Sequence, residues 1–420
     1  MRWQLMIGAR YLRSRRRELF VSLIALIAGI GVAIGVMTLC IVMAVMAGFE
    51  EDLRERILGF SPHIVLLSHG GLFEPEPDLL AKVRETPGVV AAAPFVYSQA
   101  MATTPGSVGG AIVRGVDPSH IDDVIDVSAH VRDGSAAGLG QPMSVRTLVD
   151  GEETTVEAPQ AIIGFELAKL LGVKVGDWIN LVSPLGSPTA LGFVPRVKRF
   201  AVGAVFDSGM FEYDSTIVFL ALPDAQRFLE MGSKITGIEV AVASSETAGD
   251  VARELEVRVG YPYYARDWMQ VNRNVFVAFR LQNFVQFIVL MLIILVAGFN
   301  IAATLIMVVM EKRKDIAILK SMGASQGAIA TIFIVQGAVI GVLGTALGIL
   351  GGLGGSLLLA HYHFIDLPKD VFYVSTVPVR IHPENFALVA AASFLICLLA
   401  TIYPARQAAR LPPVEVIRHE

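Results

Sequence analysis

The sequence predicts an integral membrane protein with four transmembrane helices and a large α+β domain inserted between the first and second helices. Its 420 residues are 54% hydrophobic and only 17% charged, which is too apolar for an ordinary soluble protein. The apolar residues gather in four long runs, and a polar segment of mixed α and β pattern, residues 49–280, separates the first run from the second. These two observations define the fold class.

Each apolar run is long enough to be a membrane span, because a helix crosses a bilayer core with about 20 residues. None of the four runs contains Asp, Glu, Lys or Arg, each of which costs roughly 2.5 to 3.5 kcal/mol at a helix centre. The predicted transmembrane helices cover residues 19–48, 281–310, 326–360 and 385–405. The first run is about twice as long as the apolar part of a signal peptide, so we interpret it as a helix that is retained rather than cleaved.

Basic residues predict the orientation, because they mark the cytoplasmic ends of membrane helices. Residues 1–18 carry six arginines and one glutamate, and the loop 311–325 and the tail 406–420 are also basic. All three segments are therefore expected in the cytoplasm. The domain 49–280, with 30 acidic and 19 basic residues from Glu50 to Arg280, and the loop 361–384 are expected outside.

Glycines recur four residues apart in the third helix. The pairs are Gly337 and Gly341, Gly344 and Gly348, Gly348 and Gly352, and Gly351 and Gly355. Small residues at this spacing let helix backbones approach closely in a membrane. Two interpretations remain open, packing against helices of the same subunit and a seam between two subunits.

The outer domain alternates short β-branched runs, such as "HIVLL" and "FAVGAVF", with helical stretches, such as "GFELAKLLGV". This pattern predicts a mixed domain of two lobes. The two cysteines, Cys40 and Cys397, both fall in apolar runs. The outer domain therefore has no cysteine for a disulfide and must fold through its own core.

A proline-rich loop is predicted within this domain over residues 183–199. Pro184, Pro188 and Pro195 fall between two predicted strands, and long loops in compact domains are usually functional or disordered. One interpretation is a flexible connection. The other is a preformed protruding arm, because proline restricts φ and lowers the entropy lost on binding; its apolar tip would be Leu191, Phe193 and Val194.

The sequence lacks the common motifs of catalysis. It contains no "GxxxxGK[ST]" phosphate-binding loop and no "HExxH", and its "GxSxG" match, "GASQG" at residues 323–327, follows a predicted helix rather than the strand that this motif requires. His361 and His363 supply at most two metal ligands and are better explained as an interfacial pair beside Tyr362. We therefore expect no catalytic residue, no metal, no cofactor and no nucleic acid on this chain, and any energy for transport must come from a partner.

A short charged helix interrupts two apolar runs at "MEKRKDIAILKSMGAS". Ile316, Leu319 and Met322 recur at helical spacing, and charged residues fill the remaining positions, so the segment 311–325 reads as an amphipathic cytoplasmic helix. Since the chain has no phosphate-binding loop, this helix is the expected docking site for an external ATPase. The candidate coupling residues are Glu311, Arg313, Asp315, Ile316, Leu319, Lys320, Met322 and Gly323.

These segments resemble the FtsX/MacB-like permeases of type VII ABC transporters, and within them the lipoprotein-releasing subunits of LolC, LolE or LolF type. The N-terminal helix with its exit "MAGFEEDLRERILG", the helix "EKRKDIAILKSMGAS" and the end "YPARQAARLPPVEVIRHE" carry the resemblance. It extends over nearly the whole chain. The resemblance implies a bacterial inner-membrane protein with cytoplasmic termini and a MacB-like periplasmic domain.

The stretch "TALGFVPRVKRF" resembles the hook by which LolC-type subunits recruit a periplasmic chaperone. Ala190 stands where a proline is expected in that hook, and Ala47 where the helix exit usually has asparagine. The resemblance implies that the hook binds a LolA-like chaperone. The candidate hook residues are Pro184, Pro188, Thr189, Leu191, Gly192, Phe193, Val194, Pro195 and Arg196.

The resemblance also implies the mechanism. A LolD-like ATPase dimer, which binds ATP and magnesium, pushes on the coupling helices, and the permease then passes a triacylated lipoprotein from the membrane lipids to the chaperone. Differential contact with the ATP-bound and ATP-free partner is what such a push requires. The acyl chains are expected beside the first two helices, at Met43, Met46, Phe49, Phe279, Phe284 and Phe287.

Two other functions and one open question accompany this interpretation. A MacB-like efflux or mechanotransmission permease usually has a fused nucleotide-binding domain, and an FtsX-like scaffold that regulates cell-wall hydrolases has a smaller outer domain. Lipoprotein release is therefore preferred. The sequence does not distinguish a permease made of two identical copies from one made with a related second subunit.

Overall fold

The computed structural model describes residues 19–149, 152–189, 192–362 and 376–412. The chain divides into two compact units. One, which we call the membrane unit, holds the described residues 19–51, 278–362 and 376–412. The other, the outer unit, holds the described residues between 52 and 277. This division agrees with the predicted fold class.

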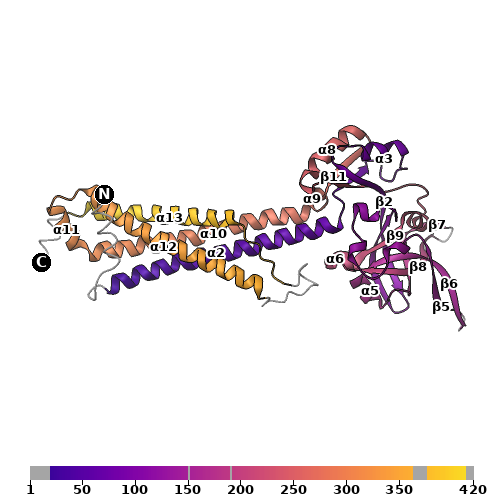
Figure 1. Ribbon diagram of the computed structural model, residues 1–420, viewed down its shortest axis with the longest axis horizontal. Helices are drawn as coiled ribbons and strands as arrows, with labels where there is room; N and C mark the ends of the chain where they lie inside the picture. The colour runs from indigo at the N-terminus through magenta and orange to yellow at the C-terminus, as the bar shows by residue number, and fades with distance from the viewer. Residues whose placement is uncertain (1–18, 150–151, 190–191, 363–375, 413–420) are drawn as a thin grey trace. The chain divides into compact units, whose positions relative to one another are not determined.

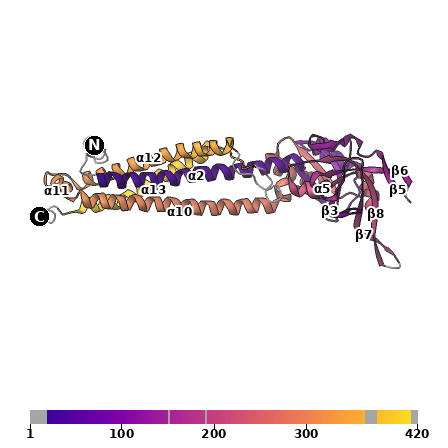
Figure 2. The ribbon, with the colours of Figure 1, turned by 90° about the horizontal axis from the view of Figure 1, so that it is seen from below.

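Four long helices dominate the membrane unit and lie side by side (Figures 1 and 2). Each is long and apolar enough to cross a membrane, so the four predicted helices are confirmed. A short helix, α11 (Arg313–Ser321), follows α10. The four are α2 (Leu19–Phe60), α10 (Arg273–Glu311), α12 (Gln326–His361) and α13 (Pro383–Arg410).

Two of these helices extend beyond the apolar runs. Helix α2 continues through "EEDLRERILGF" to Phe60, and α10 begins at Arg273 rather than at residue 281. The extensions are amphipathic, and Ile57 and Phe60 are buried in the core of the outer unit. Packing of an apolar stripe against a core stabilises a helix. The two helices can therefore continue beyond the residues whose composition suits a membrane span.

The glycines of α12 pack against other helices of the same chain. A Cβ atom added at Gly348 would lie 2.6 Å from Val36 Cβ and 2.7 Å from Ala33 O of α2. At Gly341, the added Cβ would lie 2.8 Å from Cys397 Cβ of α13. The glycine faces are thus occupied within the chain, which favours the interpretation of packing within one subunit.

The outer unit contains one mixed sheet of eleven strands in the order β11-β1-β10-β2-β3-β9-β6-β8-β4, with β5 paired to β6 and β7 paired to both β2 and β8. The pairs β3 with β9 and β6 with β8 are parallel. The strands are β1 (Ile64–Ser68), β2 (Val89–Thr104), β3 (Ser107–Val116), β4 (Val131–Gly134), β5 (Pro142–Val149), β6 (Glu152–Gly164), β7 (Trp178–Thr189), β8 (Gly192–Phe206), β9 (Ile217–Ala221), β10 (Gly237–Val242) and β11 (Tyr263–Asp267).

Because β7 pairs with β2 as well as with β8, the strands β2, β3, β9, β6, β8 and β7 form a closed circuit.

Short helices connect these strands. The helices are α3 (Pro77–Arg84), α4 (Ile121–Val124), α5 (Phe165–Leu171), α6 (Phe211–Thr216), α7 (Leu222–Leu229), α8 (Ala248–Val259) and α9 (Trp268–Val271).

Among the described residues, two large apolar cores and a smaller one hold the outer unit together. The predicted division into two lobes stays a prediction, because the outer residues form one compact unit. In the first large core, the ring of Phe60 stacks on Phe206 with centroids 5.0 Å apart and meets Phe219 edge-on at 5.8 Å. In the second, Phe200 and Phe228 meet edge-on at 5.9 Å. The last turn of α2 is therefore part of the first core of the outer unit.

A buried carboxylate fixes the start of α6. Oδ1 of Asp214 accepts hydrogen bonds from the backbone N–H of Ser208 at 2.8 Å and from its hydroxyl at 2.7 Å. Burial raises the pKa of Asp214 to about 6, against the lowering effect of these two bonds, and the nearby Asp207 raises it further. The folded protein therefore holds a proton on Asp214 more tightly than an unfolded chain does.

A matched glycine pair tests the helix packing. Gly348→Ala should destabilise the full chain in detergent micelles by about 1–3 kcal/mol, because its methyl group would overlap α2. Gly354→Ala is the control in the same helix, since nothing lies within 4 Å of a Cβ at Gly354; it should be neutral or stabilising by up to about 1 kcal/mol. The measurement is the midpoint of denaturant unfolding, and equal midpoints would contradict the packing.

The raised pKa of Asp214 predicts a pH dependence of stability. Its contribution should be fully present below about pH 4 and lost as the pH rises through about 6, by up to about 3 kcal/mol. Asp214→Asn keeps an oxygen acceptor but cannot titrate. The difference in unfolding free energy between wild type and this variant should therefore change between about pH 4 and 7; a constant difference would refute the assignment.

Candidate functional site

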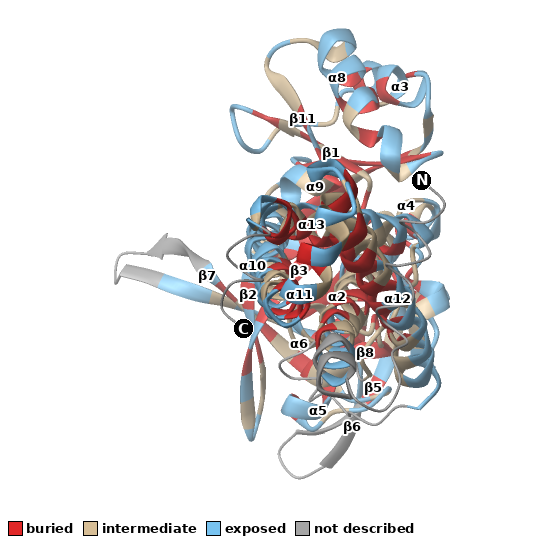
Figure 3. Cartoon of the chain, turned by 90° about the vertical axis from the view of Figure 1, so that its left-hand side faces the viewer, coloured by how far each residue is buried: buried red, intermediate tan, exposed pale blue. Residues whose placement is uncertain are grey.

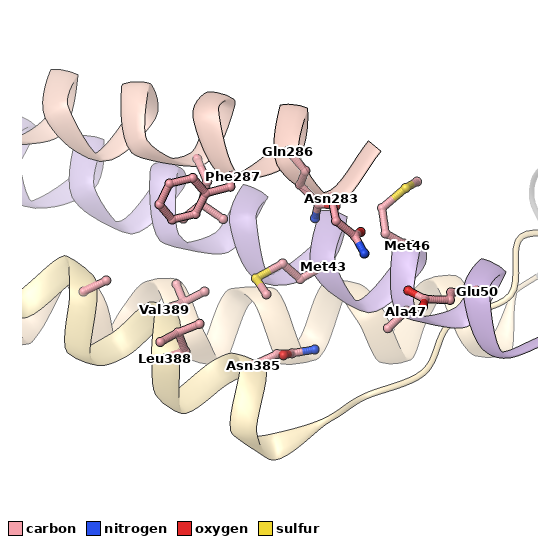
Figure 4. Close-up of a pocket in the computed structure, with 12 residues that line it drawn as sticks. Met43, Met46, Ala47, Glu50, Asn283, Gln286, Phe287, Asn385, Leu388 and Val389 are labelled. Atoms are coloured by element: carbon pink, nitrogen blue, oxygen red, sulfur yellow. The ribbon is translucent and has the colours of Figure 1, made fainter. Parts of the chain in front are cut away.

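A pocket of about 410 Å³ lies between α2, α10 and α13 of the membrane unit (Figure 4). Each helix lines it with residues at positions i, i+3, i+4 and i+7, which form one face of an α-helix. The lining residues are Met43, Met46, Ala47 and Glu50 of α2, Asn283, Gln286, Phe287 and Leu290 of α10, and Asn385, Leu388, Val389 and Ala392 of α13.

The pocket changes character along its length. In Figure 4, Glu50 lies toward one end, and Phe287 and Val389 lie toward the other. Each helix places its charged or amide side chain at one end of its stripe, Glu50 on α2, Asn283 on α10 and Asn385 on α13. The pocket therefore suits an amphiphile, whose apolar part contacts methionine, leucine and phenylalanine and whose polar part meets amides.

Half of the six expected acyl-chain residues line this pocket. Met43, Met46 and Phe287 do, whereas Phe49, Phe279 and Phe284 are not among the lining residues. Phe284 is 61% exposed on the side of α10. The expectation considered two helices and missed α13, although the helical spacing of Asn385, Leu388, Val389 and Ala392 is visible in the sequence.

The segment before α13 crosses α2 beside the pocket. A Cβ atom at Gly48 would lie 2.6 Å from the carbonyl carbon of Pro378, so only glycine permits this approach. The backbone N–H of Arg380 donates to Ala44 O at 3.0 Å. Its guanidinium lies 3.6 Å from the carboxylate of Glu51. These contacts fix α2 relative to the start of α13, which are two walls of the pocket.

Helix α11 presents an outer face different from the one expected. Ile316 is 1% exposed and packs with Phe333 and Ala405, and Leu319 is partly buried against the same cluster. Ile318 and Met322, one turn apart, are 54% and 79% exposed. Two apolar side chains are therefore exposed here, Ile318 of α11, which is not among the candidate coupling residues, and Met322, directly after the helix ends at Ser321.

Polar contacts hold α11 against the membrane helices. The ammonium of Lys320 donates to Ala409 O at 2.8 Å and to Leu411 O at 2.7 Å, at the end of α13. Gly323 has a φ of 97°, in the left-handed region that favours glycine. Lys320 and Gly323 thus position the helix, while Glu311 and Arg313 are exposed and Asp315 is partly exposed beside Lys312.

The hook segment is a β-hairpin rather than an irregular loop. Strands β7 and β8 stay paired from Trp178 and Ala201 out to Thr189 and Gly192, with an irregularity between Ser183 and Ser187. They leave the rest of the sheet as a two-stranded ribbon (Figure 3). Prolines are tolerated there because edge strands and bulges do not need every N–H.

At the hook, the structure describes Pro184, Val194 and Pro195 as exposed, and Val194 is 53% exposed. Arg196 is held at the hairpin base, where it donates to Leu229 O at 2.9 Å and pairs with Glu230. The structure describes the backbone pairing, but not the side chains, of Pro188, Thr189, Gly192 and Phe193. The expected tip residue Leu191 and its neighbour Ala190 lie outside the described residues.

Among the described residues, no group of three or more His, Cys, Asp or Glu side chains is placed to hold a metal ion. His361 lies beside Tyr362, with ring centroids 5.1 Å apart. His363 lies outside the described residues.

Comparison with known proteins places the chain in a family. Residues 25–258 match the MacB-like periplasmic core domain, and residues 287–413 match the FtsX-like permease C-terminal family. The lipoprotein-releasing system transmembrane protein LolC of Xylella fastidiosa (strain 9a5c) is 32% identical, over 99% of this chain and 98% of its own length.

Two further relatives match over a similar length. LolC of Neisseria meningitidis serogroup B (strain ATCC BAA-335 / MC58) is 32% identical over 99% of this chain and 98% of its own. LolE of Haemophilus influenzae (strain ATCC 51907 / DSM 11121 / KW20 / Rd) is 30% identical over 98% of each. With its four apolar helices, the chain is an inner-membrane protein with a periplasmic domain, and it belongs to the LolC/LolE family of FtsX-like permeases.

Proposed function

We propose that this chain is a permease subunit of an ATP-driven transporter that extracts triacylated lipoproteins from the inner membrane and passes them to a periplasmic chaperone. The pocket between α2, α10 and α13 is the observation that carries the proposal. It has an apolar part for acyl chains and a polar end for the groups that join those chains to the protein. The LolC and LolE relatives are lipoprotein-releasing system transmembrane proteins, which supports the same substrate class.

The energetics explain why such a pocket is needed. Each methylene that leaves the bilayer for water costs about 0.8 kcal/mol, so exposing whole acyl chains would cost more than a single protein contact supplies. An apolar shelter reduces this cost at each step of the transfer. The remaining energy has to come from a partner, because no acidic or basic residue lies within the apolar runs to couple transport to protons or sodium.

That partner is an ATPase dimer, which binds ATP and magnesium, and α11 is its docking site. The exposed face of α11 combines Ile318 with Arg313 and Lys314. It is flanked by Glu311, at the end of α10, and by Met322, directly after Ser321. An apolar pair within a charged rim is the usual composition of a protein interface. Lys320 supports force transmission, since it joins α11 to the end of α13.

The hook recruits a LolA-like chaperone. Its two-stranded ribbon carries the exposed Val194 and Pro195 on one arm and Pro184 on the other. A paired ribbon with a restricted backbone loses less entropy on binding than a flexible loop. The permease works with a second copy of itself or with a related subunit, and both chain termini lie in the cytoplasm.

Reconstitution tests the function. The chain and its ATPase partner are placed in liposomes that contain a triacylated lipoprotein, ATP and chaperone are added, and soluble lipoprotein is measured. We expect ATP-dependent release, and its absence would sink the proposal. Ala392→Trp fills the pocket and should slow release by about tenfold or more, the effect of losing about 1.4 kcal/mol. Leu395→Trp, on the exposed side of the same helix, is the control.

Crosslinking to the chaperone tests the hook. Deletion of residues 188–195 should abolish crosslinking to the chaperone while the ATPase still copurifies. Unchanged crosslinking would count against the hook assignment.

Copurification tests the docking helix. Ile318→Asp and Met322→Asp place a charge at exposed positions, so they should abolish copurification of the ATPase without changing the unfolding midpoint. Ile316→Ala empties a buried site and should instead destabilise the membrane unit by about 2–5 kcal/mol. If the ATPase copurifies unchanged with the two Asp variants, α11 is not the docking site.

A further inference from the structure

The outer unit has a second groove, of about 420 Å³, that the proposed function does not use. It lies on the open face of the sheet over β1, β10, β2 and β3, between α6 and α9. Aromatic side chains form much of its wall. They are Phe95, Tyr97, Tyr213 and Trp268.

An ion pair lies in the floor of this groove. Arg114 of β3 and Glu239 of β10 flank β2 in the sheet, and they meet across it with Nη2 2.6 Å and Nε 3.0 Å from Oε1 of Glu239. Arg114 is 7% exposed and Glu239 is 4% exposed, and both line the groove. Burial raises the pKa of Glu239, and the charge of Arg114 opposes that rise.

The side chains of Arg114 and Glu239 have hydrogen-bonding atoms that the ion pair does not use. Both hydrogen bonds from Arg114 end on the same oxygen, Oε1. Within the described residues, no hydrogen bond reaches Oε2 of Glu239 or comes from Nη1 of Arg114, and neither atom is among those sealed from solvent. One acceptor, Oε2 of Glu239, and one donor, Nη1 of Arg114, thus remain available in the groove.

This combination selects the chemistry of a ligand. An extended residue turns its N–H and its C=O to the same side, which makes it the complement of a carboxylate oxygen and a guanidinium N–H. The charged residues that line the groove, Arg114, Arg266, Glu212 and Glu239, balance in formal charge, so a charged ligand group would lose its hydration without gaining a net counter-charge. The rings of Tyr97, which is exposed, and Tyr213, which is partly exposed, offer apolar area to a neighbouring side chain.

We infer that this groove binds an uncharged, extended segment of the substrate polypeptide, with its backbone on Arg114 and Glu239 and an apolar side chain between the aromatic rings. The inference rests on the proposed function, since it assigns the groove to the protein part of a lipid-anchored substrate. Tyr97, 49% exposed at the groove, is the accessible position from which to detect the segment.

Two synthetic lipopeptides test it on the full chain in nanodiscs. Both carry the same triacylated cysteine; one ends there, and the other continues into an uncharged segment that contains phenylalanine. We expect the longer lipopeptide to bind at least about tenfold more tightly, as two charge-assisted hydrogen bonds allow. A photoreactive benzoylphenylalanine in place of Tyr97 should crosslink to the longer lipopeptide only.

The variant that removes the polar pair is Arg114→Met with Glu239→Met. Apolar replacement of a buried ion pair is often tolerated, so the variant should fold and bind both lipopeptides with equal affinity. Tyr97→Ala, at an exposed position, should also reduce the ratio by which the longer lipopeptide binds more tightly than the short one. Asp224→Asn is the control, because Asp224 is a buried, paired carboxylate outside the groove, and it should leave that ratio unchanged.

The outcomes separate this inference from the proposed function. If the short lipopeptide binds and the longer one binds no better, the groove does not take the substrate polypeptide. Crosslinks from position 97 to a second copy of the chain, or to the same chain, would also overturn the inference. If neither lipopeptide binds the nanodisc-embedded chain above empty nanodiscs, the acyl pocket and with it the proposed function fail.

Discussion

The close approach of α12 to α2 and α13 is the constraint on which the membrane unit depends. Inside a bilayer, apolar side chains gain nothing from leaving lipid for protein, so helices associate through close packing and a few polar contacts. Gly348 and Gly341 supply that packing, since any Cβ would overlap Val36 or Cys397. The hydroxyls of Thr345 and Ser393, 3.2 Å apart, add a polar contact between α12 and α13.

The same packing determines where the pocket forms. Helix α2 uses Val32, Val36 and Cys40 against the glycines of α12, and only beyond them does it turn Met43 and Glu50 toward the pocket. Helix α13 contacts α12 at Cys397 and lines the pocket with residues nearer its start. Two pocket walls are thus fixed to one central helix, and their spacing follows from the glycines rather than from contacts inside the pocket.

The sequence predicted the four helices and the mixed α and β character of the outer domain, because long apolar runs and β-branched runs are local signals. It did not predict which face of α11 is exposed. Ile316, Leu319 and Met322 share a helical spacing, but the end of α13 covers Ile316 and leaves Ile318 and Met322 uncovered. That choice depends on a neighbour far along the chain. The paired hook strands were missed because three prolines suggested a loop, whereas pairing between β7 and β8 continues past them.

Under the proposed function, the pocket must release its ligand. Its polar lining residues are Glu50 and three neutral amides, Asn283, Gln286 and Asn385, and the amides can hydrogen-bond to ester and amide groups without the large desolvation cost of a buried charge. A ligand bound equally well in two states of the protein cannot be moved by switching between them. Modest, adjustable contacts allow a small change in helix spacing to alter affinity, since the three stripes lie on three separate helices. A pocket built from one rigid helix pair would not offer that control.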